Sequence, residues 1–372
     1  MNKFWKVLVV AVALIPAVTF AGHHEGEAPK KELTKEEART KNTEYVKHHT
    51  LDSHDFGLFT NEETGSHIGF PLPVILWEDG LHVFMSSSFH PEEGNEHGVA
   101  ESNGKYFMIG HHDGQVYSCD EHGNILEDVS EDAEGNEVVS EIQPLDFSIT
   151  KNVFSTILIC LLLFFVFRSV AKSYASGLAP TGAAKFFEPI VLFIRDEIAI
   201  PNIGNDYKKY MNYLLTVFFF IWFLNLAGMT PLGINVTGNI AVTAGLAIFT
   251  FLITNLSAKK DYWMHIFWMP GVPIPMKIML IPIELVGLVV KPFALMIRLY
   301  ANMLAGHIVL GSLIAVVVYF DSYLAKGAFV GLTFFMNIIE LLVAALQAYI
   351  FTMLTALYFG SAAAEHAHEE AH

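Results

Sequence analysis

Five long apolar runs, separated by shorter polar segments, occupy the chain beyond its first 146 residues. A membrane helix needs about 20 apolar residues, so each run predicts a membrane span. The predicted spans are 147–168, 210–228, 239–256, 278–318 and 327–359. Between the first two, residues 183–200 mix apolar and charged side chains at helical spacing, which predicts an amphipathic helix on the membrane surface.

The fourth run is too long for an ordinary span. Residues 278–318 would extend about 60 Å as one helix, twice the thickness of a bilayer core. The helix is therefore expected either to tilt strongly or to break near Pro292. Residues 257–277, just before it, are polar and rich in proline and predict a loop.

The first 146 residues show a different pattern. Short alternating segments flank Asp79-Gly80 and Asp113-Gly114, two hairpin signals that predict a small, mainly β domain. Ahead of them, Thr34 to Glu37 resembles a capping box that opens a polar helix up to about His49. The predicted fold is an all-α polytopic membrane protein of five spans and one surface helix, with a small, mainly β or mixed N-terminal domain.

The chain opens with Lys3 and Lys6, an apolar run over residues 7–18, and small residues up to Ala21. This order is typical of a secretory signal peptide over residues 1–21, and the alternative is a retained short anchor. The predicted domains are then a periplasmic domain, 22–146, a membrane domain, 147–361, and a tail, 362–372.

Charge supports this division. Residues 22–146 hold 27 Asp and Glu against 7 Lys and Arg, a net charge of −20. The whole chain has a net charge of −16, so the rest of the chain is slightly basic. In the membrane domain, the segments 168–209 and 257–277 hold six and three Lys and Arg, whereas 229–238 and 320–325 hold none. Basic loops stay in the cytoplasm, so the N-terminal domain is expected outside and the tail inside. Cys119 and Cys160 fall in different environments, and no disulfide is expected.

A few polar side chains interrupt the last two apolar runs. Arg298 is costly at bilayer depth and needs a polar partner. Asn302 and Glu284 each lie about 40° round the helix from it, so the three form one stripe, whereas His307 projects about 180° away. The last run carries Glu340 and Gln347, which share one face and lie about 10 Å apart. The other polar groups of these two runs thus become candidate partners for the guanidinium.

These residues carry a family resemblance. The stretch from Phe293 to His307, preceded by Pro282-Ile283-Glu284 and followed by Glu340 and by Leu346 to Phe351, resembles subunit a of F-type ATP synthases. The resemblance extends from Phe147 to the C-terminus. In some members of that family glutamate stands at the position of His307 and histidine at that of Glu340, so that this chain exchanges the pair.

The resemblance implies a non-catalytic stator subunit of the bacterial inner membrane, next to a c-ring of small proteolipids and to the b subunits of the peripheral stalk. It implies that Arg298, Asn302, His307, Glu340, Gln347 and Glu284 carry protons between two half-channels. Neither a cofactor nor a metal is expected, and nucleic acid is not expected among the partners. No Gly-rich phosphate loop is present, which argues against nucleotide chemistry in this chain.

Several alternatives remain open at this point. Arg298 could pair inside its own bundle, His307 and Gln347 could be packing groups, and Glu284 could reach the membrane surface. The chain could also be a stand-alone secondary transporter or channel, although its halves lack the similarity that such transporters show. A sensor domain on a membrane anchor is a third possibility. The twelve histidines of residues 22–146, His23-His24, His48-His49 and His111-His112 among them, and the His-rich tail invite a metal hypothesis, but zinc-like spacing is absent.

Overall fold

The computed structural model has two compact units, one within residues 158–372 and one within residues 47–157. The structure describes residues 52–60, 67–89, 98–110, 113–131, 137–175, 182–230, 234–268, 273–318 and 322–363. The expected signal peptide, the capping box at Thr34, the three histidine pairs named above and the tail beyond residue 363 lie outside these ranges.

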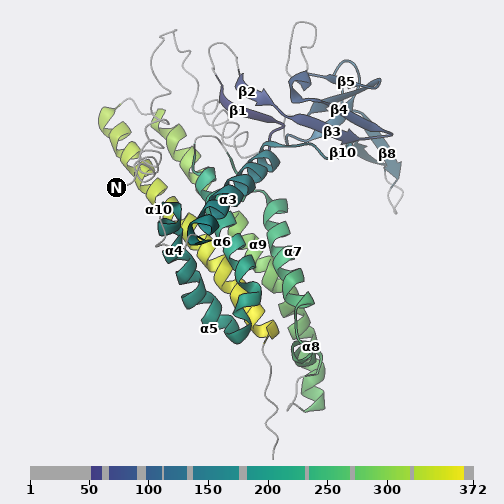
Figure 1. Cartoon of the computed structure of the whole chain (residues 1–372). Coiled ribbons are helices and arrows are strands. Elements are labelled where there is room, and N and C mark those ends of the chain that lie inside the picture. Colours follow the sequence, from purple (N-terminus) through teal and green to yellow (C-terminus); the bar gives the residue numbers. More distant parts are fainter. Residues whose placement is uncertain are drawn as a thin grey trace, which may run out of the picture. The chain divides into compact units, whose positions relative to one another are not determined.

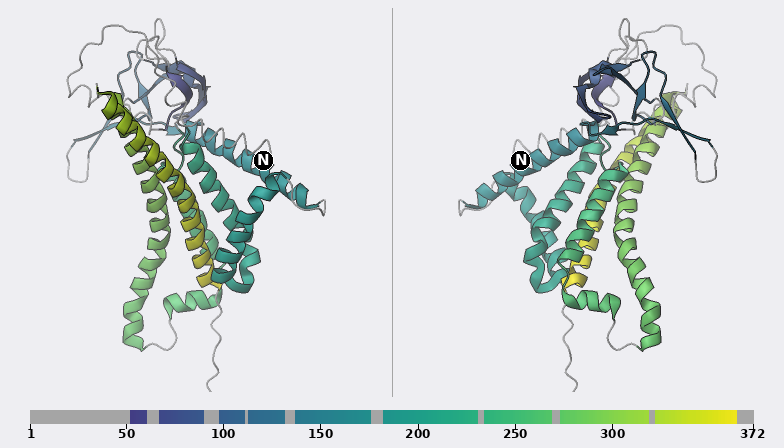
Figure 2. Two further views of the ribbon diagram at one scale, coloured as in Figure 1. Left: turned by 90° about the vertical axis from the view of Figure 1, so that its left-hand side faces the viewer. Right: turned by 90° about the vertical axis from the view of Figure 1, so that its right-hand side faces the viewer.

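The larger unit is helical (Figures 1 and 2). Its helices are α3 (Lys151–Ala175), α4 (Ala183–Phe193), α5 (Ile200–Ile203), α6 (Tyr207–Gly228), α7 (Ile240–Leu256), α8 (Lys260–Phe267), α9 (Ile274–Val318) and α10 (Tyr323–Ala363). A π-helical turn, η2 (Ile194–Ala199), joins α4 to α5, and a 3-10 turn, η3 (Gly204–Asp206), leads into α6. Four described helical stretches are long and apolar enough to cross a membrane, and α7 with α8 makes a fifth if the bent pair counts as one span. The prediction of five spans agrees with this count.

Helix α9 continues through Pro282 and Pro292 without a break. Its 45 residues and the 41 of α10 correspond to about 68 and 62 Å, so neither helix fits upright within a bilayer core of about 30 Å. Of the two sequence-based alternatives for residues 278–318, the structure forms the single long helix. Helix α10 packs along both α6 and α9, and α7 packs along α9.

The predicted amphipathic segment 183–200 is formed by α4, η2 and the start of α5. It buries Phe187, Ile194 and Ile198, and η2 packs against α6 and α10. Lys185 and Glu197 remain exposed, as the pattern of apolar and charged positions requires.

The Phe-rich run of α6 belongs to the core of this unit. Phe218 and Phe219 are buried, and the ring of Phe219 lies 4.8 Å from that of Phe167 on α3. These two side chains therefore serve packing inside the bundle.

One prediction for this unit is wrong. Residues 257–277 were expected to form a loop, but they contain helix α8, which turns away from α7 by 101° (Figure 2). Tyr262 and Ile266 of α8 are buried beside Ala362 at the end of α10. An eight-residue helix is shorter than the windows in which helical periodicity is recognisable, and packing against α10 stabilises it.

The described residues of the smaller unit form ten strands in four antiparallel sheets. The strands are β1 (Asp55–Thr60), β2 (His67–Pro71), β3 (Pro73–Trp77), β4 (Leu81–Met85), β5 (Ala100–Ser102), β6 (Lys105–Ile109), β7 (Val116–Cys119), β8 (Glu127–Glu131), β9 (Glu137–Glu141) and β10 (Leu145–Asp146). Their orders are β1-β2, β10-β3-β4, β5-β6-β7 and β8-β9, and a 3-10 turn, η1 (Ser86–Phe89), follows β4. Both predicted hairpins are confirmed as β3-β4 and β6-β7. Asp79 and Gly80 adopt positive φ angles of 52° and 157°, as the turn between β3 and β4 requires.

The core of this unit lies under the hairpins and contains Val74, Leu76, Phe89, Ala100, Phe107 and Val116.

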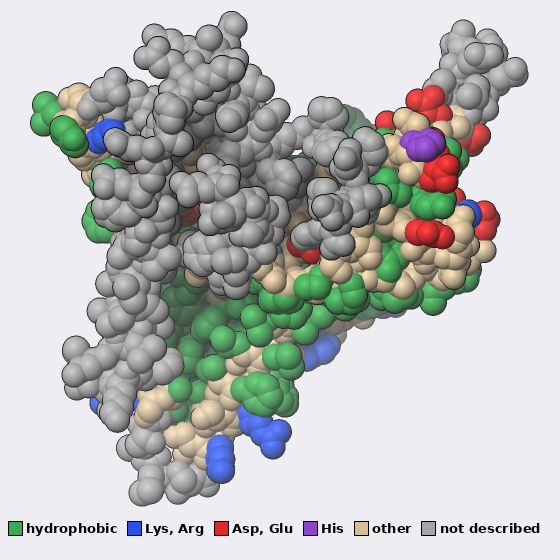
Figure 3. Space-filling model, turned by 90° about the horizontal axis from the view of Figure 1, so that it is seen from above, with side chains coloured by type: hydrophobic (Ala, Val, Ile, Leu, Met, Phe, Trp, Pro, Cys, Tyr) green, Lys and Arg blue, Asp and Glu red, His purple; other side chains and the backbone are tan. Residues whose placement is uncertain are grey.

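The two cysteines form no disulfide. Cys119 is buried and Cys160 exposed, and both are free thiols, as expected. Figure 3 shows acidic side chains gathered in one region of the surface.

The first membrane helix begins later than predicted. Residues 147–149 continue β10 along β3, because the Phe147 and Ile149 amides donate to the carbonyls of Ile75 and Pro73. Helix α3 then starts at Lys151, where Asp52 accepts hydrogen bonds from the Thr150 hydroxyl and the Asn152 amide. A carboxylate from a distant segment thus caps the helix, which local sequence does not reveal.

Candidate proton pathway

The polar stripe of α9 faces outward. Arg298 and Asn302 are exposed and Glu284 is half-buried, while Leu295, Leu299 and Met303 turn into the bundle. Within the described part of the chain, Arg298 makes no hydrogen bond or ion pair. The alternative in which Glu284 or Glu340 neutralises this guanidinium inside the bundle is therefore not what the structure forms.

Glu340 of α10 and His307 of α9 lie on the inner side of the bundle, at one level along its axis. A Cβ built on Gly306 would lie 2.6 Å from Oε1 of Glu340, so the carboxylate of α10 rests against this glycine. The next residue, His307, places Nε2 3.4 Å from the Cβ position of Gly228 at the end of α6. The sequence placed an imidazole and a carboxylate on different helices, and packing brings them to one level of the bundle.

Both groups have buried polar atoms without partners. Among the described residues, Nε2 of His307 and both carboxylate oxygens of Glu340 make no hydrogen bond, and the Glu340 residue is only 7% exposed. Buried polar groups nearly always have partners, so orphaned ones call for an explanation such as bound water or a role in proton transfer. Asn235, on the segment before α7, has two more such atoms.

Sequence reasoning missed a group of amide and hydroxyl side chains beside this pair. Asn225 of α6 is fully buried, donates through Nδ2 to the Ala344 carbonyl at 3.3 Å and accepts through Oδ1 from the Thr237 hydroxyl at 2.9 Å. Ala344 lies one turn beyond Glu340 on α10. An amide inside the apolar run 210–228 was the signal that could have drawn attention to it.

The contacts between α9 and α10 also place Gln347. Gly306 meets Glu340, and the ammonium of Lys291 lies 5.6 Å from the centre of the Tyr358 ring, so the two helices are antiparallel. This register puts Gln347, which is 5% exposed, at the level of Leu299, next to Arg298 in sequence. The stripe of α9 and the polar face of α10 thus lie at the same depth along the two helices.

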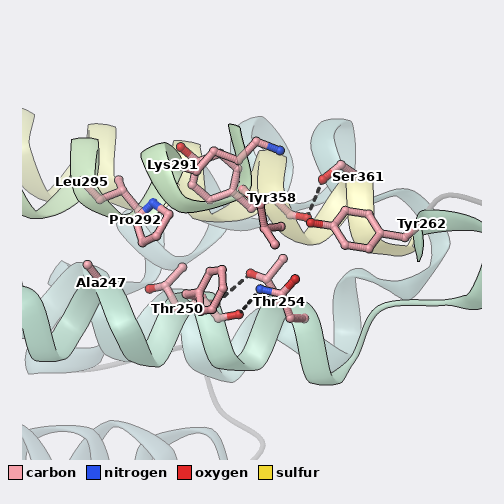
Figure 4. Close-up of a pocket in the computed structure, with 12 residues that line it drawn as sticks. Ala247, Thr250, Thr254, Tyr262, Lys291, Pro292, Leu295, Tyr358 and Ser361 are labelled. Carbon is pink, nitrogen blue, oxygen red and sulfur yellow. Dashed lines mark hydrogen bonds between the residues drawn. The ribbon is translucent and has the colours of Figure 1, made fainter. Parts of the chain in front are cut away.

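A second polar region lies farther along the same helices (Figure 4). A cavity of about 20 Å³ is lined by residues of α7, α8, α9 and α10, among them Thr250, Thr254, Tyr262, Lys291 and Tyr358. That volume is enough for one water molecule, and a few hydroxyl and ammonium groups stand among the apolar side chains of its walls. It lies about 24 Å along α9 from His307.

Arg298 stands between these two regions. It is seven residues from Lys291 and nine from His307, or about 10 and 13 Å along the axis. Tyr358 of α10 and Tyr262 of α8 both line the cavity on the Lys291 side of Arg298. The helix therefore carries polar regions toward both ends, separated by one exposed cation.

Comparison with known proteins identifies the family to which this chain belongs. The model of the family described as ATP synthase A chain matches residues 153–360. The chain belongs to this family. It is 44% identical over 239 residues to ATP synthase subunit a of Pelodictyon phaeoclathratiforme, covering 62% of this chain and 70% of that protein. ATP synthase subunit a of Chlorobium phaeobacteroides strain BS1 is 47% identical over 234 residues, covering 60% and 68%.

The match to another relative reaches well into the N-terminal domain. ATP synthase subunit a of Chlorobium phaeobacteroides strain DSM 266 is 40% identical over 289 residues, which cover 74% of this chain and 82% of the relative. Residues 45–147 match a second family, described as a domain of unknown function. Family membership and the apolar helices together make this chain a multi-pass membrane protein with an added domain.

Proposed function

We propose that this chain is the proton-translocating stator subunit of a rotary ATP synthase, and that Arg298 faces the ring of small proteolipid subunits. The observation that carries the proposal is the exposed guanidinium at the middle of α9, which has no partner among the described residues. A membrane-embedded cation requires a counter-charge, and a carboxylate on each ring subunit would supply it. Family membership supports the same assignment.

The guanidinium would allow only ionised ring carboxylates to pass. Arginine keeps its proton under all physiological conditions, so a ring carboxylate that reaches Arg298 is held ionised. Each ring carboxyl group must therefore release its proton before it passes Arg298, and it takes up another proton afterwards. This separation is the role of the two half-channels, and it couples proton flow to rotation.

The uptake path would run past His307 and Glu340, then Asn302 and Gln347, to a ring carboxylate. The orphaned buried atoms of His307 and Glu340 support this path, since an imidazole and a carboxyl can both accept and donate protons. Release would follow the water-sized cavity beside Lys291 and Tyr358 toward Glu284. Each proton crossing 100 mV supplies about 2.3 kcal/mol, so several are needed for each ATP made on other subunits.

The remaining assignments follow from charge and family. The bases of segments 168–209 and 257–277 support a bacterial inner-membrane protein whose basic loops and tail face the cytoplasm and whose N-terminal domain faces the periplasm. The partners are the c-ring, the peripheral-stalk b subunits and the rest of the complex. The subunit itself is non-catalytic and needs no cofactor.

The test compares Arg298→Ala with Arg168→Ala, which removes an exposed guanidinium from α3 instead. ATP-driven acidification of inverted vesicles should disappear for Arg298→Ala and persist for Arg168→Ala, and both complexes should assemble. Normal pumping by Arg298→Ala would refute the mechanism. Co-purification of a small proteolipid ring separates this function from that of a stand-alone transporter, which would isolate without a ring.

A further inference from the structure

One face of the sheet β10-β3-β4 is entirely apolar. The strand register aligns Leu145, Trp77 and Leu81 in one row. The hydrogen bonds of residues 147 and 149 continue the ladder, so that Phe147, Ile75 and Val83 form a second row. Ile149, Pro73 and Met85 form a third. Opposite residues of neighbouring strands point to the same side, so these nine side chains share one face.

The face is open within the described structure. Its exposed fractions are 65% for Phe147, 62% for Leu145, 57% for Val83 and 53% for Trp77. The opposite side of the same strands carries Val74 and Leu76, which are fully buried in the core of the domain. An antiparallel sheet with one buried face normally turns polar side chains to water on the other. An apolar outer face indicates that the sheet also contacts an apolar partner on its outer side.

Charged side chains lie near both ends of the sheet, but none belongs to this face. Lys105 forms ion pairs of 2.9 and 2.8 Å with Glu78 and Asp79, at the turn that closes β3 and β4. The row at the opposite end, Ile149 with Pro73 and Met85, has no charged member. This apolar end is the one that continues into α3.

The sheet and the first turns of α3 form one compact unit. The Lys151 amide donates to the Ser53 carbonyl, and Asp52 holds Thr150 and Asn152. One turn farther, the Phe154 ring lies 5.4 Å from that of Phe56 on β1. The region 47–157 therefore includes both the apolar face and the beginning of a candidate membrane span, Lys151–Tyr174.

We propose that the nine-residue apolar face of β10-β3-β4 lies in the interfacial layer of the bilayer that α3 enters. The third row ends two residues before Lys151, so the face cannot be far from the headgroups of the lipids around that helix. Strands of five residues extend about 16 Å, and interfacial elements bury about 5–10 Å. Trp77 and Phe147 are aromatic side chains of the kind that anchor proteins at this depth.

Docking on lipid explains why an acidic domain presents an uncharged face. Anionic headgroups would repel its carboxylates, whereas the nine side chains carry no charge and gain by leaving water. The consequence is a second anchor beside α3, which would fix the orientation of that helix. The proposal is independent of proton transport and of which side of the membrane the domain occupies.

The test measures the depth of nitroxide labels in the intact complex reconstituted into lipid. Val83→Cys and Leu145→Cys are each labelled in a chain that carries Cys119→Ala and Cys160→Ala, and Glu101→Cys on β5 serves as the exposed polar control. Both sheet positions lie on the open face, so the label displaces no core residue. Collision of each label with oxygen, which concentrates in lipid, is compared with collision with a water-soluble nickel chelate.

The expected result is a several-fold higher ratio of oxygen to nickel collisions at 83 and 145 than at 101. A ratio at 83 and 145 equal to that at 101 would show that the face lies in water and would overturn the proposal. Protection of both labels from both reagents would show that protein covers the face, and would overturn it as well. Using two positions keeps the test valid if one labelled variant fails to assemble.

Discussion

The carboxylate of Glu340 lies against the backbone of Gly306, so closely that a Cβ at residue 306 would be 2.6 Å from Oε1. The contact sets the register of α9 against α10 at the level of His307. It also leaves the carboxylate buried and without a hydrogen-bond partner among the described residues. The size of the residue at position 306 therefore determines where the Glu340 carboxylate can lie.

Gly306→Ala should slow proton transport without harming assembly. The methyl group pushes the flexible end of Glu340 aside, while alanine in a helix is more stable than glycine by about 1 kcal/mol. We expect ATP-driven vesicle acidification to fall about tenfold, the effect of 1.4 kcal/mol on a transfer barrier. Gly287→Ala on the same helix is the matched control, because a Cβ there meets nothing within 4 Å. Equal rates for the two variants would contradict a transport role for Glu340.

Exchanging the imidazole and the carboxyl should do less harm than removing either. The double variant His307→Glu with Glu340→His keeps one group of each kind at the same level of the bundle, whereas His307→Ala or Glu340→Ala breaks the relay. Acidification rates of the three variants, measured at equal amounts of assembled complex, decide the matter. If the exchange is as damaging as the single losses, the two side chains serve packing.

The hydrogen bond between Asn225 and Thr237 can be tested by a double-mutant cycle. Asn225→Leu leaves the buried Thr237 hydroxyl without its partner and should destabilise the subunit by about 1–3 kcal/mol. Adding Thr237→Val removes the orphaned hydroxyl and should recover part of the loss. Thermal melting of the purified complex gives the four values. Additive effects of the two substitutions would show that the pair is not coupled.

Gly360 marks a close approach between α10 and α5. A Cβ there would clash with the carbonyl oxygen of Asn202. That oxygen belongs to the backbone, which cannot move aside as a flexible side chain can. Gly360→Ala should therefore destabilise the packing by about 1–3 kcal/mol. A lower yield of assembled complex than for Gly331→Ala, whose Cβ meets nothing within 4 Å, would confirm this. Equal yields would mean that the two helices can separate at no cost.

The His54–Asp146 pair predicts a pH dependence for the N-terminal domain. Burial tends to raise the pKa of Asp146, but the hydrogen bonds it accepts from His54, at 2.9 Å, and from Ser148 outweigh burial and lower this pKa below its ordinary value of 3.8. The folded pKa is below the unfolded one, so the stabilisation is present above about pH 4 and is lost as pH falls through the folded pKa.

Asp146→Asn should accordingly weaken the domain at pH 7 by about 1 kcal/mol. Hydrogen–deuterium exchange of the segments covering β3 and β10, corrected for the intrinsic rate at each pH, measures this loss in the intact complex. The difference between wild type and variant should shrink as pH falls below 4. A difference that is constant with pH would assign the effect to packing instead of charge.

Much of this architecture is determined locally and was readable from the sequence. Membrane spans are set by the length of apolar runs, and the two hairpins by their turn residues, because both signals depend on contiguous residues. The polar stripe of Glu284, Arg298 and Asn302 follows from helical periodicity alone, which needs only that α9 be helical.

Tertiary structure decided what contiguous residues cannot express. Helix α8 is held by the end of α10, the start of α3 is delayed by a ladder along β3, and Asp52 caps it from a hundred residues away. The meeting of Glu340 with Gly306, and of Asn225 with Thr237, depends on which faces of separate helices pack together. Periodicity assigns each side chain to a face of its own helix, but only packing selects the helix it meets.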